Sequence, residues 1–252
     1  MSIALQKTNT ISDNSSQPGR RGPDELVPSR YALRVGEIEV LVVSDGVIQI
    51  SAETMAPNAD PAVRSAWLHD RFLPETVDWS LNQVVLRSGG RTILIDSGLG
   101  NEYPGFPRSG RWASRLEAAG IELGSVTDVV LTHMHFDHVG GLLVDGVKDR
   151  LRRDLRVHAA AAEADFWESP DFSRTAMPAS MQYMIRSSAR HFLDEYRSEL
   201  RTFEAEYQVA PGVLVTRTGA ESEAMRPPIP TESGHPFRSK AATDSEAMRP
   251  PC

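Results

Sequence analysis

Short apolar runs separated by turn residues dominate the first part of the chain. Residues 38–43 and 47–50 are β-branched runs on either side of Ser44-Asp45-Gly46, and an Asp-Gly pair between such runs favours a hairpin turn. Residues 83–86 and 92–95 flank a Ser-Gly-Gly turn in the same way. The pattern therefore predicts that the domain begins as antiparallel sheet.

Farther along the chain, the apolar residues change to helical spacing. Trp112, Leu116 and Ala119 recur at that spacing, and Gly120 follows as a stop signal. The Val- and Leu-rich run 126–131 then predicts a buried strand. A helix followed by a strand is expected here, and this strand leads directly into a histidine-rich stretch.

The remaining pattern alternates between strands and helices. It predicts a strand at 155–158, an Ala-rich helix at 159–168, a long helical segment from Met181 to about residue 200, and a last strand at 213–216. The Pro-containing stretch 56–78 predicts a loop that carries a short helix. This succession indicates the α/β (α+β) class.

The two ends of the chain differ from its middle in composition. Residues 1–28 are rich in Ser, Asn, Gln, Gly and Pro, and residues 219–252 contain six prolines but no Val, Leu, Trp or Tyr. The segment Ser222–Pro228 is repeated at Ser245–Pro251. We therefore expect a disordered tail at 1–28, a folded domain at 29–218, and a disordered tail foreign to that domain at 219–252.

The bulk composition limits the class of function. The chain has 252 residues, of which 40% are hydrophobic and 24% charged, so it is long enough to bury a core. Its net charge of -7 provides no basic surface for nucleic acid and no attraction to an anionic membrane. No apolar run reaches the ~18 residues of a membrane span, and residues 1–23 lack the apolar region of a secretory signal, so a cytoplasmic location is expected. One cysteine, Cys252, excludes an intramolecular disulfide and a thiolate metal cluster.

The densest chemistry lies in Thr132–Gly141. Three of the chain's seven histidines and one carboxylate fall within six positions, as His133, His135, Asp137 and His138. In extended backbone, side chains at i and i+2 share a face, so His133 and His135 can bind one cation. A turn after them would direct the other two toward a second cation, and metal pairs ~3.5–4 Å apart are a recognised hydrolytic arrangement. The alternative is that these histidines are polar surface residues.

Asp96 and the other histidines are open to simpler interpretations. Asp96 ends the predicted strand 92–95 before a glycine-rich turn, where a turn Asp often caps backbone amides. His69, His158 and His191 are interpreted as surface or hydrogen-bonded core histidines. His235 is the only remaining histidine that could serve as a further ligand, and it would have to be ordered from a flexible tail.

The motif resembles that of a known family. The pattern His133-x-His135-x-Asp137-His138 after a buried strand, with Asp96 upstream, resembles the metallo-β-lactamase-fold hydrolase superfamily. The segments Leu131–Gly141, Ala164–Trp167 and Val209–Val213 resemble its methyl parathion hydrolase and quorum-quenching lactonase-like branch. The resemblance covers about residues 31–219 and implies an αββα sandwich with a dinuclear zinc site.

The resemblance also implies a role for each residue. His133 and His135 would bind the first zinc, Asp137 and His138 the second, and Asp96 would support the site from behind the ligands. Asp137 is the residue assigned to catalysis, and no organic cofactor is expected. A metal-bound hydroxide, its pKa lowered toward ~7, would attack an ester, lactone or phosphotriester. Manganese, iron or cobalt remain alternatives to zinc.

The C-terminal part departs from the family pattern. The family has a Gly-His-Thr-x-Gly-His segment after the strand that is here 213–216, then a bridging Asp and a last His, whereas this chain continues with Gly219-Ala220-Glu221-Ser222. The sandwich is therefore expected to be incomplete in its C-terminal half. Two hypotheses follow: a zinc-dependent hydrolase of a small molecule, or an inactive truncated or frameshifted fragment that lacks the remaining ligands. A homodimer is left open; no nucleic-acid or membrane partner is expected.

Overall fold

The computed structural model describes residues 29–56, 58–100, 105–173, 175 and 177–217. The expected disordered tails at 1–28 and 219–252 lie outside the described residues, as does His235.

Most of the strands form one mixed sheet. Seven strands lie in the order β1-β2-β3-β4-β5-β6-β7, so neighbours in the chain are also neighbours in the sheet. Pairing is antiparallel from β1 to β4 and parallel from β4 to β7, while β8 and β9 form a separate antiparallel hairpin. The strands are β1 Arg30–Val35, β2 Ile38–Ser51, β3 Thr76–Ser88, β4 Arg91–Ile95, β5 Asp128–Val130, β6 Arg156–Ala160, β7 Leu200–Phe203, β8 Glu206–Ala210 and β9 Val213–Thr216.

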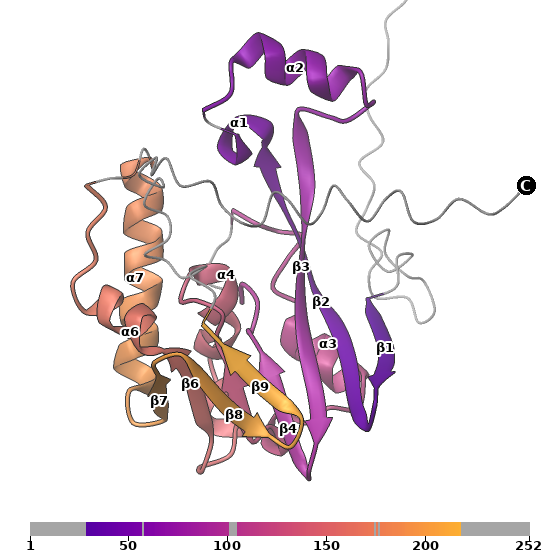
Figure 1. The fold of residues 1–252 in the computed structure, drawn as a ribbon, viewed down its shortest axis with the longest axis vertical. Helices are drawn as coiled ribbons and strands as arrows, with labels where there is room; N and C mark the ends of the chain where they lie inside the picture. The colour runs from indigo at the N-terminus through magenta and orange to yellow at the C-terminus, as the bar shows by residue number, and fades with distance from the viewer. Residues whose placement is uncertain (1–28, 57, 101–104, 174, 176, 218–252) are drawn as a thin grey trace, which may run out of the picture.

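Helices connect the parallel strands and extend one end of the antiparallel part. In Figure 1, α6 and α7 stand beside the β6–β7 edge, and α1 and α2 lie beyond the upper ends of β2 and β3. The helices are α1 Ala52–Met55, α2 Pro61–His69, α3 Trp112–Ala118, α4 Phe136–Val139, α5 Val147–Arg150, α6 Ala161–Glu168 and α7 Ala179–Tyr196, with 3-10 turns η2 Leu123–Ser125 and η3 Gly140–Leu143. No helix in these ranges is both long and apolar enough to cross a bilayer.

The two faces of the sheet are covered unequally. On one face, Leu94, Val129 and Val157 pack with residues of α3, α4 and α7 in a large core. On the other, Ile93 and Val130 pack under the β8–β9 hairpin in a smaller cluster. The hairpin therefore provides a second layer over the middle of the sheet.

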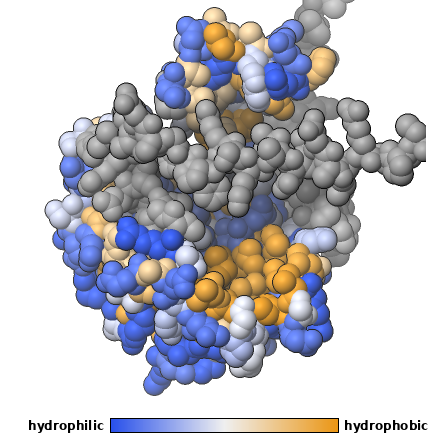
Figure 2. Space-filling model, in the orientation of Figure 1, coloured by the Kyte–Doolittle hydropathy of each residue, from blue (hydrophilic) through white to orange (hydrophobic). Residues whose placement is uncertain are grey.

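The apolar side chains of this second face continue toward β1. The register aligns Tyr31 with Val42, Val42 with Val84, and Val84 with Ile95, and directly opposed residues of a sheet share a face. Ile95 packs against the β8–β9 cluster, whereas Tyr31 is 66% exposed. Figure 2 shows a broad hydrophobic surface in this region of the molecule. Among the described residues, the β8–β9 hairpin thus covers only part of this apolar face, and the part near β1 is exposed.

The predicted first hairpin is wrong. Strand β2 runs through Ser44-Asp45-Gly46 with only a shift of register there, and the chain turns at Gly36 instead. At Gly46 the carbonyl oxygen of Arg108 approaches the strand so closely that a Cβ atom there would lie 2.1 Å from it. Because of this packing against Arg108 and Ser109, the Asp-Gly pair forms a bulge instead of a turn.

The other predicted elements agree better with the structure. The second hairpin (β3–β4), the helix at Trp112, and strands within 126–131 and at 213–216 are all present. The helical segment predicted to reach residue 200 ends at Tyr196, because Leu200 pairs with Val157 in β7. Strands β1 and β8 were not predicted. The mixed α/β fold with a seven-stranded sheet agrees with the predicted class.

Candidate metal centre

The histidine motif lies at the carboxyl end of β5, where parallel strands commonly place functional groups. After β5 ends, residues 131–135 form a connection into α4, and His135 is the N-cap of that helix. The ring centroids of His133 and His135 are 4.4 Å apart, and those of His133 and His138 are 3.9 Å apart. The structure therefore brings together the three histidines that the sequence singled out.

Asp137 and Asp96 lie on either side of His138. The Nε2 atom of His138 is 3.5 Å from Asp137 Oδ2, and its Nδ1 atom is 2.9 Å from Asp96 Oδ2. A carboxylate only accepts, so each contact is a hydrogen bond when the facing ring nitrogen carries a proton. Both carboxylates that the sequence singled out are thus in contact with the same imidazole.

Asp96 also holds the start of the motif. Its Oδ1 accepts a hydrogen bond of 2.8 Å from the Thr132 amide, and its Oδ2 accepts one of 2.9 Å from the Thr132 hydroxyl. The backbone of Asp96 has φ 57°, a left-handed conformation that costs a residue with a Cβ roughly 1–2 kcal/mol. The hydrogen bonds that Asp96 makes across the fold to Thr132 and His138 act against that cost.

The glycines behind the motif allow another backbone segment to approach it. A Cβ on Gly140 would lie 1.9 Å from the Leu99 carbonyl oxygen, and one on Gly141 would lie 1.9 Å from that of Ser97. The Ser97 amide donates to the His138 carbonyl at 2.7 Å across this contact. Glycine is therefore required at positions 140 and 141 so that the turn after β4 can pack against the motif.

Burial and neighbouring charges move the pKa values of the motif in different directions. Burial lowers the pKa of His135 to about 3, with a further contribution from His133, and burial followed by the charge of His138 lowers the pKa of His133. Burial alone would lower the pKa of His138 too, but hydrogen bonds to Asp137 and Asp96 outweigh it and raise that pKa to about 10. For Asp137, burial opposes ionisation, yet the hydrogen bond and charge of His138 keep its pKa below the usual value.

The donor atoms of the motif are of the types that bind a divalent cation, but their spacing does not form a coordination site. The Nε2 atom of His135 is buried and has no hydrogen-bond partner among the described residues, and a neutral imidazole nitrogen of this kind is a zinc ligand. Within the same part of the chain, however, no three His, Cys, Asp or Glu side chains converge closely enough to hold a metal ion. The donor types are present, but their present arrangement is not a closed coordination shell.

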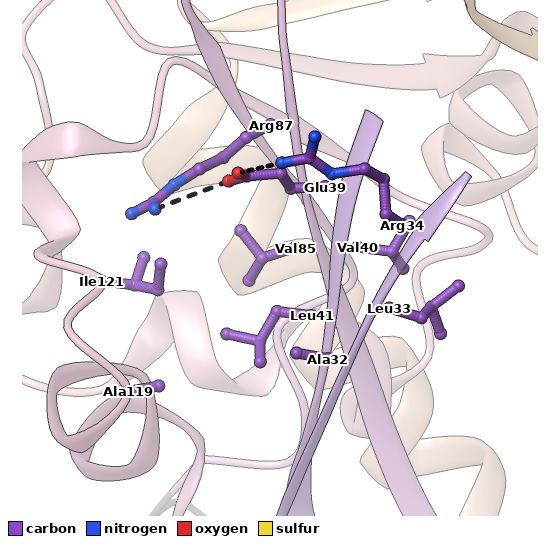
Figure 3. Close-up of a pocket in the computed structure, with 10 residues that line it drawn as sticks. All are labelled: Ala32, Leu33, Arg34, Glu39, Val40, Leu41, Val85, Arg87, Ala119 and Ile121. Atoms are coloured by element: carbon purple, nitrogen blue, oxygen red, sulfur yellow. Dashed lines mark hydrogen bonds and ion pairs between the residues drawn. The ribbon is translucent and has the colours of Figure 1, made fainter. Parts of the chain in front are cut away.

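A hollow elsewhere on the sheet is a poorer candidate. Residues of β1–β3, with Ala119 and Ile121, line a cavity of about 370 Å³ that contains no histidine (Figure 3). Its carboxylate, Glu39, pairs with Arg34 at 3.1 Å and with Arg87 at 4.0 Å, and all three side chains are about half exposed. The carboxylate in this hollow is therefore already paired with two arginines, and the histidine motif remains the candidate site.

Three residues that shape the motif, Thr132, Glu163 and Asp45, were not among the predicted site residues. Thr132 links Asp96 to the motif, Glu163 contacts the backbone between His133 and His135, and Asp45 holds the segment after Asp96. A signal existed only for Glu163, which shares a helix face with Trp167 at i+4. Of the other histidines, His158 is a buried core residue 2.8 Å from Asp128, whereas His69 and His191 are exposed, as expected.

Comparison with known proteins agrees with the motif. The family model of the metallo-beta-lactamase superfamily matches residues 77–222, which is more than half of the chain. This chain belongs to the metallo-β-lactamase superfamily. The resemblance seen in the sequence is thereby confirmed at the level of the superfamily. No curated protein matches the chain.

Solved structures of metallo-β-lactamase-fold proteins share the fold at low identity. "AidC, a Dizinc Quorum-Quenching Lactonase" matches with 24% identity and a TM-score of 0.62 over 72% of this chain and 63% of its own. The hydrolase AbOPH matches with 23% identity and a TM-score of 0.58 over 75% of this chain and 69% of its own. A probable metal-dependent hydrolase from Staphylococcus aureus matches with 17% identity and a TM-score of 0.58 over 73% and 65%. The present chain thus spans about two thirds of the length of these relatives.

Proposed function

We propose that the chain is a metal-dependent hydrolase of a small ester, lactone or phosphotriester, with its site at the histidine motif. The observation that carries this proposal is the cluster of three imidazoles and Asp137 at the end of β5, in which His135 Nε2 is buried without a partner. Membership of the metallo-β-lactamase superfamily supports it. The likeness to proteins described as a dizinc lactonase and a metal-dependent hydrolase adds to that support.

Each residue has a distinct part in this proposal. His133 and His135, kept neutral by burial, would hold one zinc ion, and Asp137 with His138 would hold a second. A bound metal would supply a hydroxide of lowered pKa and would polarise the oxygen under attack. In the metal-free chain, ionised Asp137 accepts a hydrogen bond from His138 Nε2, while Asp96 orients that ring through Nδ1. Zinc remains the proposed metal, with manganese, iron or cobalt as alternatives.

A second candidate is the inactive fragment, and two observations favour it. Among the residues that the structure describes, no three donors converge, and none covers the exposed Tyr31 end of the apolar face near β1. Such a chain would bind zinc weakly and would hydrolyse nothing. The proposed domain limits at residues 29–218 are compatible with either candidate.

Activity of the metal-loaded chain separates the two candidates. The purified full-length chain, supplied with zinc, manganese or cobalt, is assayed on a panel of aryl esters, lactones and phosphotriesters. The hydrolase proposal expects turnover of at least one class, lost in His133→Ala and Asp137→Ala but kept in His69→Ala, whose side chain is exposed and distant in sequence from the motif. Turnover that survives His133→Ala, or none with any metal, would contradict it.

We also propose a cytoplasmic homodimer that acts on a small molecule and binds neither nucleic acid nor membrane. The apolar row in which Tyr31 is exposed and Val42 is half-buried provides a surface on which a second copy could pack as sheet on sheet. Sedimentation velocity over a range of concentrations tests the dimer, and cell fractionation tests the location.

A further inference from the structure

Glu163 is a fully buried carboxylate beside the histidine motif. It lies in the first turn of α6, and its side chain is 0% exposed. Its Oε1 atom accepts a hydrogen bond of 2.7 Å from the amide of Met134, the residue between His133 and His135. A buried carboxylate is costly unless it is hydrogen-bonded, so its presence here calls for a function beyond filling space.

The same oxygen atom also holds an aromatic ring that borders the motif. Trp167, one turn farther along α6, donates its indole N–H to Glu163 Oε1 at 2.7 Å. The Trp167 ring meets the His135 ring edge-on, with centroids 6.1 Å apart and planes at 75°. The Glu163 side chain therefore contacts the motif in two ways: directly at the backbone amide of Met134, and indirectly through the Trp167 ring that packs against His135.

The backbone around His133 is anchored from both sides. The Leu131 amide donates to the His158 carbonyl of β6, and the Thr132 amide donates to Asp96. The Met134 amide donates to Glu163. Beyond Leu131, this stretch lies outside the regular sheet ladder, so two carboxylates from different parts of the chain take over the anchoring of the segment that carries His133.

We propose that Glu163 is a positioning residue that fixes the imidazoles of His133 and His135 through Met134 and Trp167. Its consequence for metal binding rests on the proposed function, whereas its effect on the two rings does not. Glutamine can accept both hydrogen bonds through its amide oxygen, whereas alanine can accept neither. Glu163→Gln and Glu163→Ala therefore separate the hydrogen bonds from the presence of a side chain.

The first measurement needs no metal. The imidazole nitrogen signals of the full-length chain, labelled with ¹⁵N-histidine and treated with chelator, are compared in the parent, Glu163→Gln, Glu163→Ala and Trp167→Phe. We expect Glu163→Gln to keep the His135 and His133 signals at their parent positions and Glu163→Ala to move both toward those of exposed histidines. Trp167→Phe removes the indole donor and should move His135 more than His133. Glu168→Gln is the control on the same helix, because Glu168 is exposed and pairs with Arg197.

The second measurement uses cobalt(II) as a spectroscopic metal probe. Residues that orient metal ligands typically change metal affinity by about 10- to 100-fold when removed. We expect Glu163→Ala to weaken cobalt binding within that range and to alter the visible absorption bands, and Glu163→Gln to stay within about threefold of the parent. All variants are compared at a temperature at which circular dichroism shows each to be folded.

The outcomes distinguish this inference from the proposed function. If Glu163→Ala leaves the histidine signals in place, or if Glu163→Gln is as damaging as Glu163→Ala, the positioning role is wrong. If the parent binds no cobalt but the histidine signals respond as expected, the positioning role stands and the proposed metal-dependent function fails. If Glu163→Ala does not fold, Glu163→Gln and Trp167→Phe still decide the result, because Gln has nearly the size of Glu and Phe keeps an aromatic ring at position 167.

Discussion

Replacing Asp45 should destabilise the fold in proportion to the number of amides left without an acceptor. The Asp45 side chain is completely buried, and Oδ2 accepts from the amides of Leu99 at 2.9 Å and Gly110 at 3.2 Å. Its Oδ1 accepts from the Trp112 amide at 2.7 Å. One carboxylate thus ties together both ends of the segment that follows Asp96.

The expected magnitudes follow from these contacts. Asp45→Ala leaves the buried amides of Leu99 and Trp112 and the half-buried amide of Gly110 without this acceptor, and each costs about 1–3 kcal/mol, so about 3 kcal/mol or more is expected. Asp45→Asn can keep the two bonds at the Oδ2 position but places an NH₂ group against the Trp112 amide, for a loss of about 1–3 kcal/mol. Burial raises the pKa of Asp45, and removing a carboxylate that is costly to bury offsets part of the loss in both variants.

Thermal unfolding of the full-length chain measures this effect. In a protein of this size, 1 kcal/mol shifts the melting temperature by roughly 2–4 °C, so Asp45→Ala should lower it by about 6 °C or more and Asp45→Asn by less. Asp78→Asn is the control, because Asp78 forms an exposed ion pair with Arg108 that is worth at most ~1 kcal/mol. A melting temperature for Asp45→Ala equal to that of Asp78→Asn, or above that of Asp45→Asn, would refute the reasoning.

Three further predictions test other parts of the structure. Gly141→Ala should lower the free energy of unfolding in urea by about 1–3 kcal/mol or more, because the new Cβ would lie 1.9 Å from the Ser97 carbonyl oxygen. Gly124→Ala should be nearly neutral, because its Cβ would lie 3.4 Å from the Arg150 carbonyl oxygen. His135 has its ordinary pKa of 6.5 in the unfolded chain but a pKa of about 3 in the folded chain. The unfolded state therefore binds more protons between these two pH values, so the stability of the chelated protein should fall as the pH drops from 6.5 toward 3. The fall should be less steep in His135→Gln. If copies pair through the face near β1, Val35→Glu, at a position 58% exposed, should weaken self-association in sedimentation velocity, whereas Tyr183→Glu on α7 should not.

The sequence predicted the candidate site better than it predicted its surroundings. Histidines at i and i+2 after a buried strand are a local pattern, so His133, His135 and His138 could be placed together from spacing alone. The contacts of Asp96 with Thr132 and His138 depend on β4 and β5 being parallel neighbours, which local pattern does not determine. The roles of the three histidines, Asp137 and Asp96 in catalysis and metal binding remain predictions.

The errors in the fold have different causes. Asp45 and Gly46 have the composition of a hairpin turn, but their contacts with Leu99 and residues 108–112 keep the backbone in a bulged strand. Strand β1 carries a period-two pattern, with Tyr31, Leu33 and Val35 alternating with Arg30, Ala32 and Arg34, and this signal was overlooked. Strand β8 is exposed over its first three residues and is defined by its pairing with β9.

Metal analysis of the purified full-length chain, paired with thermal melts with and without chelator, tests the central claim most directly. If the motif is a hydrolytic centre, zinc content should approach about two ions per chain, as in two-metal sites, and chelation should lower the melting temperature. His133→Ala combined with His135→Ala should remove that dependence on metal. Zinc far below one ion per chain, with a melting temperature that does not respond to chelator, would contradict the account and favour the inactive fragment.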